Sequence, residues 1–155
     1  MSAGKIRLSS VGFAADAVLV GTQILCYNGY IPSKEERMKI LNFGSCNSDY
    51  VYTVHHIVKP CETEHSPSLR IFPGGKGLNQ SVAMARAGVP VFHAGCIGAD
   101  GGLLRDTLAA SGADVTFLRT VEERTGHALI QVDEDGENAI LVYPGANAGV
   151  TDDFI

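Results

Sequence analysis

Regular patterns of apolar and polar residues begin in this chain only near Met38. The apolar residues before that point follow neither the helical nor the strand period. Residues 39–43 then form a short apolar run that ends at Gly44, which is typical of a buried first strand in an α/β sheet. We therefore predict a folded domain over residues 38–155, preceded by an extension over residues 1–37.

Two more strand-like segments follow the first run and enclose a polar loop. Residues 49–58 alternate between two sides, and apolar residues occur on both of them. Residues 59–68 are polar and contain proline, which predicts a loop. Residues 69–72 return as a short strand that Pro73-Gly74-Gly75 would halt. The pattern predicts a small sheet that is partly apolar on each face.

The period changes from that of a strand to that of a helix after this glycine turn. Leu78, Val82 and Ala85 stand at i, i+4 and i+7, which predicts a helix over residues 77–87. Gly88 follows at the place where a helix commonly ends in a left-handed residue. Helix and strand patterns in one domain predict an α/β or mixed fold.

The remaining segments alternate between strands and helices. A strand over residues 89–95, a helix over residues 101–110 and a strand over residues 115–118 form one βαβ unit, which implies a parallel sheet. Apolar runs over residues 127–132 and 139–143 flank an acidic Asp-Gly turn. This arrangement is a strong signal for a β-hairpin.

Composition and charge narrow the class of protein. The 155 residues are 45% hydrophobic and 19% charged, as in one globular domain. Twelve basic and 17 acidic residues leave a net charge of −5, so no broad attraction to nucleic acid or an anionic membrane is available. The apolar stretch over residues 11–27 is interrupted by Asp16 and Gln23, and no Ala-x-Ala site follows it. We expect a cytoplasmic protein without a nucleic-acid or membrane partner.

The cysteine and histidine residues predict no metal site. The four cysteines include no Cys-x-x-Cys pair, which favours reduced, buried thiols. The histidines lack metal-ligand spacing to nearby carboxylates, so we expect exposed or hydrogen-bonded side chains. Neither a Ser-His-Asp nor a Cys-His catalytic arrangement can be assigned. The residues concerned are Cys26, Cys46, Cys61, Cys96, His55, His56, His65, His93 and His127.

The glycine-rich turn over residues 73–80 is the most informative motif. Its glycines would let a ligand touch the backbone, and the following helix start would point free N–H groups toward that ligand. It is not a P-loop, because no Ser or Thr follows Lys76 and no glycine stands at the required distance before it. It is not a dinucleotide fingerprint either, because Gln80 stands where the third glycine belongs. An ordinary strand-to-helix connection is the alternative.

Outside this turn, an amide and a carboxylate after the first strand are candidates for binding hydroxyl groups. Asn47 and Asp49 follow the first strand at alternate positions, so both side chains can point the same way. An amide and a carboxylate suit vicinal hydroxyls, although an Asx-type turn would use the same residues. Glu137 closes the acidic hairpin turn, whose other reading is a solvated turn.

Six motifs together resemble the ribokinase or PfkB family of carbohydrate kinases, and the resemblance covers residues 39–151. The order and spacing of the motifs match, and the turn with Gly-Gly-Lys-Gly is closest to the ribokinase branch. The motifs are Gly44-Ser45-Cys46-Asn47-Ser48-Asp49, Gly74-Gly75-Lys76-Gly77-Leu78-Asn79-Gln80, Gly98-Ala99-Asp100, Thr125-Gly126, Gly136-Glu137-Asn138 and Pro144-Gly145-Ala146-Asn147.

The resemblance implies a fold and an activity. The fold is α/β, a ribokinase-like parallel sheet flanked by helices and covered by a small β lid. The activity is transfer of the γ-phosphoryl group of ATP to a hydroxymethyl group of a sugar, with Mg²⁺ expected for the complete enzyme. The lid strands would be those of residues 49–58 and 69–72 with the hairpin of residues 127–143. Such lids often pair between subunits, which implies a homodimer.

The resemblance also assigns roles to individual residues. Asn47 and Asp49 would hold sugar hydroxyls, and Gly74 and Gly75 would supply close backbone contacts. Two donors, Lys76 and Asn79, would come from the turn and the helix start, and Glu137 would reach in from the lid. A nucleoside kinase of the same fold is an alternative, but the glycine turn suits the ribokinase branch better.

The departures from the family pattern concern its catalytic half. The family's Gly-Ala-Gly-Asp motif, which carries the catalytic Asp, is not found in this sequence, and neither is the ATP site. We therefore predict no catalytic residue here, and a truncated domain that by itself is inactive and prone to aggregate. The alternative is an inactive sugar-binding or lid-interaction fragment from a truncated gene. A smaller departure is Cys61, where the family usually has glycine.

The start of the chain suggests a second hypothesis. Residues 34–37 can all be written in purine-only codons, as in a bacterial ribosome-binding sequence, and Met38 follows them directly. Met38 would then be the true initiator. The alternative is a genuine but variable N-terminal arm.

Overall fold

The computed structural model describes residues 39–151 and residue 154, so the predicted extension and Met38 lie outside the described residues. The strands are β1 (Ile40–Phe43), β2 (Asn47–Thr53), β3 (Ser68–Gly74), β4 (Val91–Ile97), β5 (Leu118–Thr120), β6 (Gly126–Val132) and β7 (Asn138–Tyr143). The helices are α1 (Lys76–Arg86), α2 (Gly102–Ser111) and the short 3₁₀ helix η1 (Gly145–Gly149). Neither α-helix in the described part of the chain combines the length and apolar character that a membrane crossing requires.

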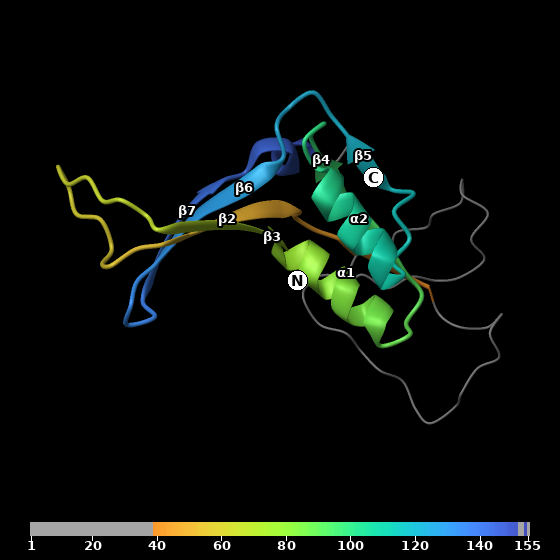
Figure 1. Cartoon of the computed structure of the whole chain (residues 1–155). Helices are drawn as coiled ribbons and strands as arrows, with labels where there is room; N and C mark the ends of the chain where they lie inside the picture. The colour runs from red at the N-terminus through yellow and green to blue at the C-terminus, as the bar shows by residue number, and fades with distance from the viewer. Residues whose placement is uncertain (1–38, 152–153, 155) are drawn as a thin grey trace, which may run out of the picture.

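A three-stranded sheet in the order β1-β4-β5 forms the centre of the core. Both pairs of strands are parallel, with Phe43 opposite Ala94 and Gly95 opposite Leu118. Helices α1 and α2 lie side by side on one face of this sheet (Figure 1). The parallel sheet and the βαβ unit predicted from the sequence are therefore confirmed.

Strand β4 is buried on both of its faces, which explains its apolar sequence. Toward the helices it presents Val91 and Ile97, which pack with Leu78, Leu104 and Leu108 in the larger hydrophobic cluster. Toward the opposite face it presents Ala94 and Cys96, which pack against Ala146 of η1 and against Phe154. The 3₁₀ helix, which the sequence patterns do not predict, thus covers the second face of the sheet.

The segments predicted to form the lid make a separate four-stranded sheet in the order β3-β2-β6-β7, which projects away from the core (Figure 1). We call this sheet the lid. Strand β2 is antiparallel to β3 and parallel to β6, and β6 and β7 form the predicted hairpin. At the hairpin turn the Oδ1 atom of Asp133 accepts the backbone N–H groups of Asp135 and Glu137. The solvated-turn interpretation of this acidic tip therefore describes it well.

Two predicted strands of the lid have the wrong boundaries. Strand β2 covers Asn47–Thr53 rather than residues 49–58, because β3 starts and β6 ends opposite Thr53. Strand β3 continues through Pro73 to Gly74 instead of stopping before the proline. Proline is tolerated there because β3 is an edge strand, whose outward positions need no ladder donor.

Two strands of the core are also displaced from their predicted positions. Strand β4 covers Val91–Ile97 rather than residues 89–95, because its pairing with β1 begins opposite Ile40. Strand β5 begins only at Leu118, where the prediction ended. Before that point the Leu118 N–H bonds to the Val115 carbonyl, so residues 115–118 form a turn.

The described cysteines are all free thiols, and two of the three follow the prediction. Cys46 and Cys96 are buried, whereas Cys61 is exposed on the loop between β2 and β3. Cys61 is also the non-glycine residue of the described chain with a positive φ angle, 66°. A glycine at this position, as the family pattern has, would adopt that conformation without the clash of a Cβ atom.

The Cys61→Gly variant is expected to be more stable than the parent chain by about 0.5–1 kcal/mol. A left-handed residue with a Cβ costs about 1–2 kcal/mol, and part of this gain is offset by the larger backbone entropy of unfolded glycine. Urea denaturation measures the difference. Cys61→Ala is the matched control, because it removes the thiol but keeps the Cβ; equal stability of the Gly and Ala variants would contradict the explanation.

Candidate functional site

The candidate site lies where the lid joins the core. Asn47 is the first residue of β2, and it pairs with Gly74 of β3 on one side and Gly126 of β6 on the other. Because Gly74 and Gly126 have no side chains, the amide of Asn47 is flanked on both sides by backbone alone. The register therefore explains why glycines occur in these motifs on two different strands.

The two glycines make room for the two predicted sugar-binding side chains. A Cβ atom at Gly74 would collide with the carboxylate of Asp49. A Cβ atom at Gly126 would collide with the amide nitrogen of Asn147 and would stand 2.7 Å from Oδ1 of Asn47. The Asx-turn alternative for Asn47 and Asp49 is wrong, because both residues lie within β2.

The turn before β2 packs directly against the start of α1. Gly75 has a φ angle of 96°, and a Cβ atom there would stand 2.5 Å from the carbonyl oxygen of Ser45. That same carbonyl accepts the N–H of Leu78 at 3.1 Å. Gly75 is therefore required for packing, as an ordinary strand-to-helix connection would require. Lys76 and Asn79 lie exposed on the first turn of α1.

Asn147 of η1 holds the turn and orients Asn47. Its Oδ1 accepts the N–H of Cys46 at 2.9 Å, and its Nδ2 lies 3.1 Å from the carbonyl of Cys46. The same Nδ2 lies 2.8 Å from Oδ1 of Asn47 and 3.0 Å from the carbonyl of Pro144. Because the oxygen of Asn47 is engaged in this way, its own Nδ2 is the end left to donate to a ligand.

Sequence reasoning missed Asn147 as a site residue. The Pro144–Asn147 motif was recognised, but it suggested no contact, because Asn147 lies 100 positions after Asn47. The only signal in the sequence was the motif itself. The contact forms because η1 packs against the core sheet, and the sequence patterns do not predict η1.

Asp49 is a partly buried carboxylate that makes no hydrogen bond or ion pair within the described part of the chain. Burial removes water from the ionised carboxylate and raises the pKa of Asp49 above its usual 3.8. Such a group is a ready acceptor for hydroxyl donors. Its environment therefore differs from that of a structural ion pair.

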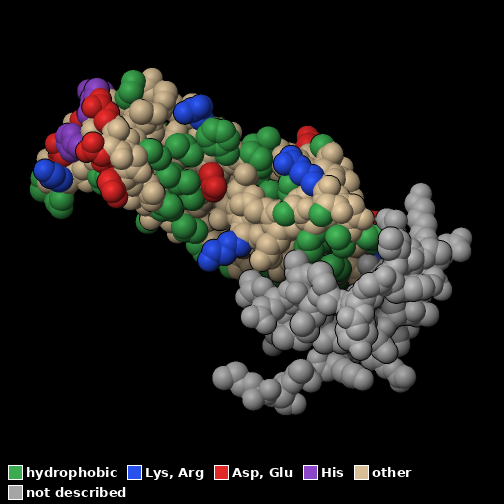
Figure 2. Space-filling model, turned by 90° about the horizontal axis from the view of Figure 1, so that it is seen from below, with side chains coloured by type: hydrophobic (Ala, Val, Ile, Leu, Met, Phe, Trp, Pro, Cys, Tyr) green, Lys and Arg blue, Asp and Glu red, His purple; other side chains and the backbone are tan. Residues whose placement is uncertain are grey.

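Glu137 is the one predicted site residue that the fold does not bring to this site. It precedes Asn138, which pairs with Val132 at the far end of β6 from Gly126. At roughly 3.3 Å per residue, that end is about 20 Å from Asn47. Glu137 is exposed, and its backbone N–H bonds to Asp133. In Figure 2 acidic and histidine side chains gather at the far end of the lid, where His55 and Glu134 interact at 2.8 Å.

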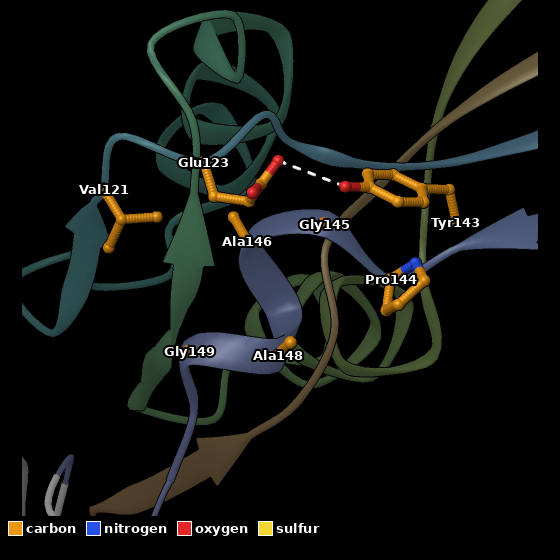
Figure 3. A pocket seen from close by; sticks show the side chains of 8 residues that line it. All are labelled: Val121, Glu123, Tyr143, Pro144, Gly145, Ala146, Ala148 and Gly149. Atoms are coloured by element: carbon orange, nitrogen blue, oxygen red, sulfur yellow. Dashed lines mark hydrogen bonds between the residues drawn. The ribbon is translucent and has the colours of Figure 1, made fainter.

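A shallow cavity of about 350 Å³ lies on the other side of η1 (Figure 3). Its two polar side chains hydrogen-bond to each other, because the hydroxyl of Tyr143 donates to Glu123 at 3.2 Å. The rest of the lining is apolar or glycine, and none of the predicted sugar-binding residues contributes to it. The lining residues are Val121, Glu123, Tyr143, Pro144, Gly145, Ala146, Ala148 and Gly149.

Comparison with known proteins finds relatives with a similar sequence. The model of the pfkB family carbohydrate kinases matches residues 37–154. The chain belongs to this family. Its sequence is 40% identical over 119 residues to a ribokinase of Haemophilus influenzae, and the match covers 75% of this chain and 39% of that protein.

Solved structures of family members agree with the fold. A ribokinase from Thermotoga maritima matches with a TM-score of 0.71 and 37% identity, over 77% of this chain and 40% of that one. A ribokinase from Arabidopsis thaliana, solved with ribose and ATP, matches with a TM-score of 0.63 and 32% identity, over 70% of this chain and 36% of that one. The predicted ribokinase-like α/β fold is thus confirmed. The chain spans about two fifths of the length of the curated relatives it matches.

The Asp49→Asn variant is expected to be more stable than the parent chain at pH 7 and equally stable near pH 3. The folded-state pKa of Asp49 is raised, so its favourable contribution is complete below the unfolded-state pKa of 3.8 and is lost as the pH rises through the folded-state value. Urea unfolding at the two pH values measures this difference. Asp106→Asn, on the exposed side of α2, is the control, and a loss of stability in Asp49→Asn at pH 7 would contradict the assignment.

Proposed function

We propose that this chain carries the sugar-binding site and the lid of an ATP-dependent sugar kinase, with a pentose such as ribose as the acceptor. The observation that carries the proposal is the partly buried carboxylate of Asp49, which has no partner among the described residues, beside the oriented amide of Asn47. The ribokinase names of the relatives, and the ribose and ATP in the Arabidopsis structure, support this choice of substrate.

The two side chains complement neighbouring hydroxyl groups. The carboxylate of Asp49 accepts a hydrogen bond from one hydroxyl, and the Nδ2 of Asn47 donates a hydrogen bond to the oxygen of a second hydroxyl. Ala128 pairs with Asp49 and Val142 pairs with Ala128, so both lie on the same face of the lid as Asp49. This apolar strip suits the C–H face of a sugar ring, while the polar pair reads its hydroxyls.

The start of α1 completes the acceptor site. Gly74 and Gly75 leave backbone accessible, and Lys76 and Asn79 would donate hydrogen bonds from the turn and the first helical turn. Their role is to bind and orient the hydroxymethyl group that receives the phosphoryl group. Glu137 remains part of the resemblance only, because of its distance from these groups.

ATP would supply the γ-phosphoryl group, with Mg²⁺ to neutralise its charge. Within the described residues no three His, Cys, Asp or Glu side chains gather so that they could hold a metal ion. The sequence also contains no Gly-Ala-Gly-Asp motif, so we assign no phosphoryl-transfer step to these residues. We propose that the 155 residues alone bind the sugar without phosphorylating it.

Calorimetry with ribose, fructose and adenosine is expected to give saturable binding of ribose, and an ATP hydrolysis assay with ribose present is expected to show no consumption of ATP. Asp49→Asn is expected to weaken that binding roughly 10- to 100-fold, as for hydrogen bonds to a charged group, and Asn47→Ala about 3- to 10-fold, as for one neutral hydrogen bond. Asp106→Asn is the matched control with unchanged affinity. Binding of adenosine but not of ribose would favour the nucleoside-kinase alternative, and full affinity in both site variants would overturn the assignment.

The Glu137→Gln variant tests whether Glu137 binds the sugar, as the family resemblance implies, or lies too far from the site, as the strand register indicates. At about 20 Å from Asn47, the side chain is too far to touch a sugar held there, so the ribose affinity is expected to stay within about twofold. A loss comparable to that of Asp49→Asn would restore Glu137 to the sugar site. The same calorimetric titration gives the answer.

We also propose that the lid pairs with the lid of a second copy. The face opposite Asp49 carries one apolar row across the sheet, in which Ile71 and Leu129 flank Tyr50, and Leu141 follows Leu129. Leu141 is 68% exposed and Ile71 49% exposed. Figure 2 shows hydrophobic side chains continuing along the lid. Burial of this row against a second copy would remove its apolar surface from water.

Sedimentation velocity is expected to detect a dimer that Leu141→Glu weakens at least about tenfold, because a charge would be buried in the apolar row. Leu103→Glu is the control, since Leu103 is a similarly exposed apolar residue on α2. A dimer that tolerates Leu141→Glu, or one that Leu103→Glu disrupts equally, would contradict pairing through the lid.

A further inference from the structure

A chain of polar side chains crosses the core directly below the turn that leads into Asn47. Ser81 of α1, His93 of β4 and Cys46 of the turn are each 0% exposed. Ser81 Oγ lies 2.8 Å from Nδ1 of His93, and Nε2 of His93 lies 3.1 Å from Sγ of Cys46. Asn42 of β1 donates to Ser81 at 2.8 Å and to the carbonyl of Gly77 at 2.9 Å. Four separate segments of the core are connected by this chain.

The hydrogen-bond chain has a direction that follows from counting donors. The amide of Asn42 gives its two hydrogens to Gly77 and Ser81. If the Ser81 hydroxyl also accepted from His93, its own hydrogen would have no acceptor among the described residues, which is costly for a buried hydroxyl. The hydroxyl therefore donates to Nδ1 of His93. The ring proton then sits on Nε2 and points to the sulfur of Cys46, and only the weak S–H donor is left over.

The side chains in this hydrogen-bond network are neutral, which is consistent with the donor direction from Ser81 through His93 to Cys46. Burial lowers the pKa of His93 to about 4. Burial, together with the neighbouring Cys96, raises the pKa of the Cys46 thiol to about 12. At pH 7 the pair is thus a neutral imidazole and a thiol, not an activated thiolate. Complete burial and the raised pKa both disfavour a nucleophilic role for Cys46 and favour a role in holding the geometry.

Cys46 is held from two sides, and both contacts end at the candidate site. His93 contacts its side chain from within the core, and Asn147 binds its N–H and carbonyl from the η1 side. Asn147 also binds the amide oxygen of Asn47, the next residue. A shift of Cys46 would therefore move Asn47 and loosen its bond to Asn147. At the other end of the network Asn42 donates a hydrogen bond to the carbonyl of Gly77, whose backbone packs against Gly44 of the same turn.

We propose that His93, as the Nε2–H tautomer, is a positioning residue of the proposed sugar site, which fixes the turn of residues 44–47 through Cys46 and so aims the amide of Asn47. The sugar affinity in this proposal rests on the proposed function, whereas the tautomer and the ordering of Asn47 do not. A buried network whose members are all paired restricts the local structure to one arrangement. Apolar side chains could fill the same space, but their contacts have no directionality and would not fix the orientation of the Asn47 amide.

Two variants separate positioning from stability. His93→Leu leaves the hydrogen of the Ser81 hydroxyl without its acceptor. The double variant Ser81→Ala with His93→Leu removes that hydroxyl, and Asn42 keeps its bond to the carbonyl of Gly77 but loses its bond to Ser81. We expect the double variant to recover part of the stability that His93→Leu loses. In both, the ribose dissociation constant is expected to rise about 3- to 10-fold, as for one lost hydrogen bond. Recovery of wild-type affinity in the double variant would overturn the proposal.

Nuclear magnetic resonance tests the proposal without any sugar. Two-bond ¹H–¹⁵N spectra of the full chain are expected to show His93 protonated on Nε2, and an Nδ1–H tautomer would overturn the proposal. In the parent chain, the two hydrogens of the Asn47 side-chain amide are expected to have chemical shifts distinct from those of an unstructured peptide. In both His93 variants these chemical shifts are expected to move toward the unstructured values, because the side chain then samples several conformations. Cys96→Ala is the matched control, because Cys96 is a buried thiol on the other face of β4 and should leave Asn47 unchanged.

These measurements distinguish two kinds of failure. If the parent chain binds no ribose, the proposed function fails, and the tautomer and the Asn47 signals still decide the role of His93. If ribose binds but the Asn47 signals and the affinity are the same in the double variant as in the parent chain, the network is structural only. The positioning role then fails while the proposed function stands.

Discussion

Close contact between backbone segments at the junction of lid and core governs the rest of this structure. A Cβ atom at Gly44 would stand 2.5 Å from the Cα of Gly77, and one at Gly95 would stand 2.8 Å from the carbonyl oxygen of Gly44. The turn after β1, the start of α1 and the strand β4 can approach this closely only because these residues have no side chains. The position of Asn47 at the end of this turn, and the direction in which α1 starts, depend on that approach.

Among the described residues, the buried polar groups at the junction have hydrogen-bond partners, whereas the partly buried carboxylate of Asp49 has none. Asn147 and His93 satisfy the turn from opposite sides, and no buried side-chain nitrogen or oxygen of the described residues lacks a hydrogen bond. Asp49 is only partly buried and has no partner within the described chain. Paired groups hold the geometry, because breaking them leaves a buried group unsatisfied. The unpaired carboxylate raises the free energy of the folded state and is therefore hard to explain by stability alone.

The sequence predicted the kinds of elements well and their limits less well. Lys76–Arg86 could be recognised because helical spacing and the glycines at both ends agree. The end of β2 at Thr53 could not, since alternation continues through Val58 while the partner strands stop. In the candidate site, Asn47, Asp49 and the glycine turn were found from motifs. Asn147 and His93 were not assigned, because their partners lie 100 and 47 positions away.

Local chemistry and tertiary packing thus determined different features of this protein. The sequence by itself determined the order of strands and helices, the glycine turn and the pairing of an amide with a carboxylate, because each depends on neighbouring residues. Only the tertiary structure decided which polar residues act together. It brought Asn147 and His93 to the turn at Cys46, and it carried Glu137 to the far end of the lid, because strand register sets the distance between residues of one hairpin.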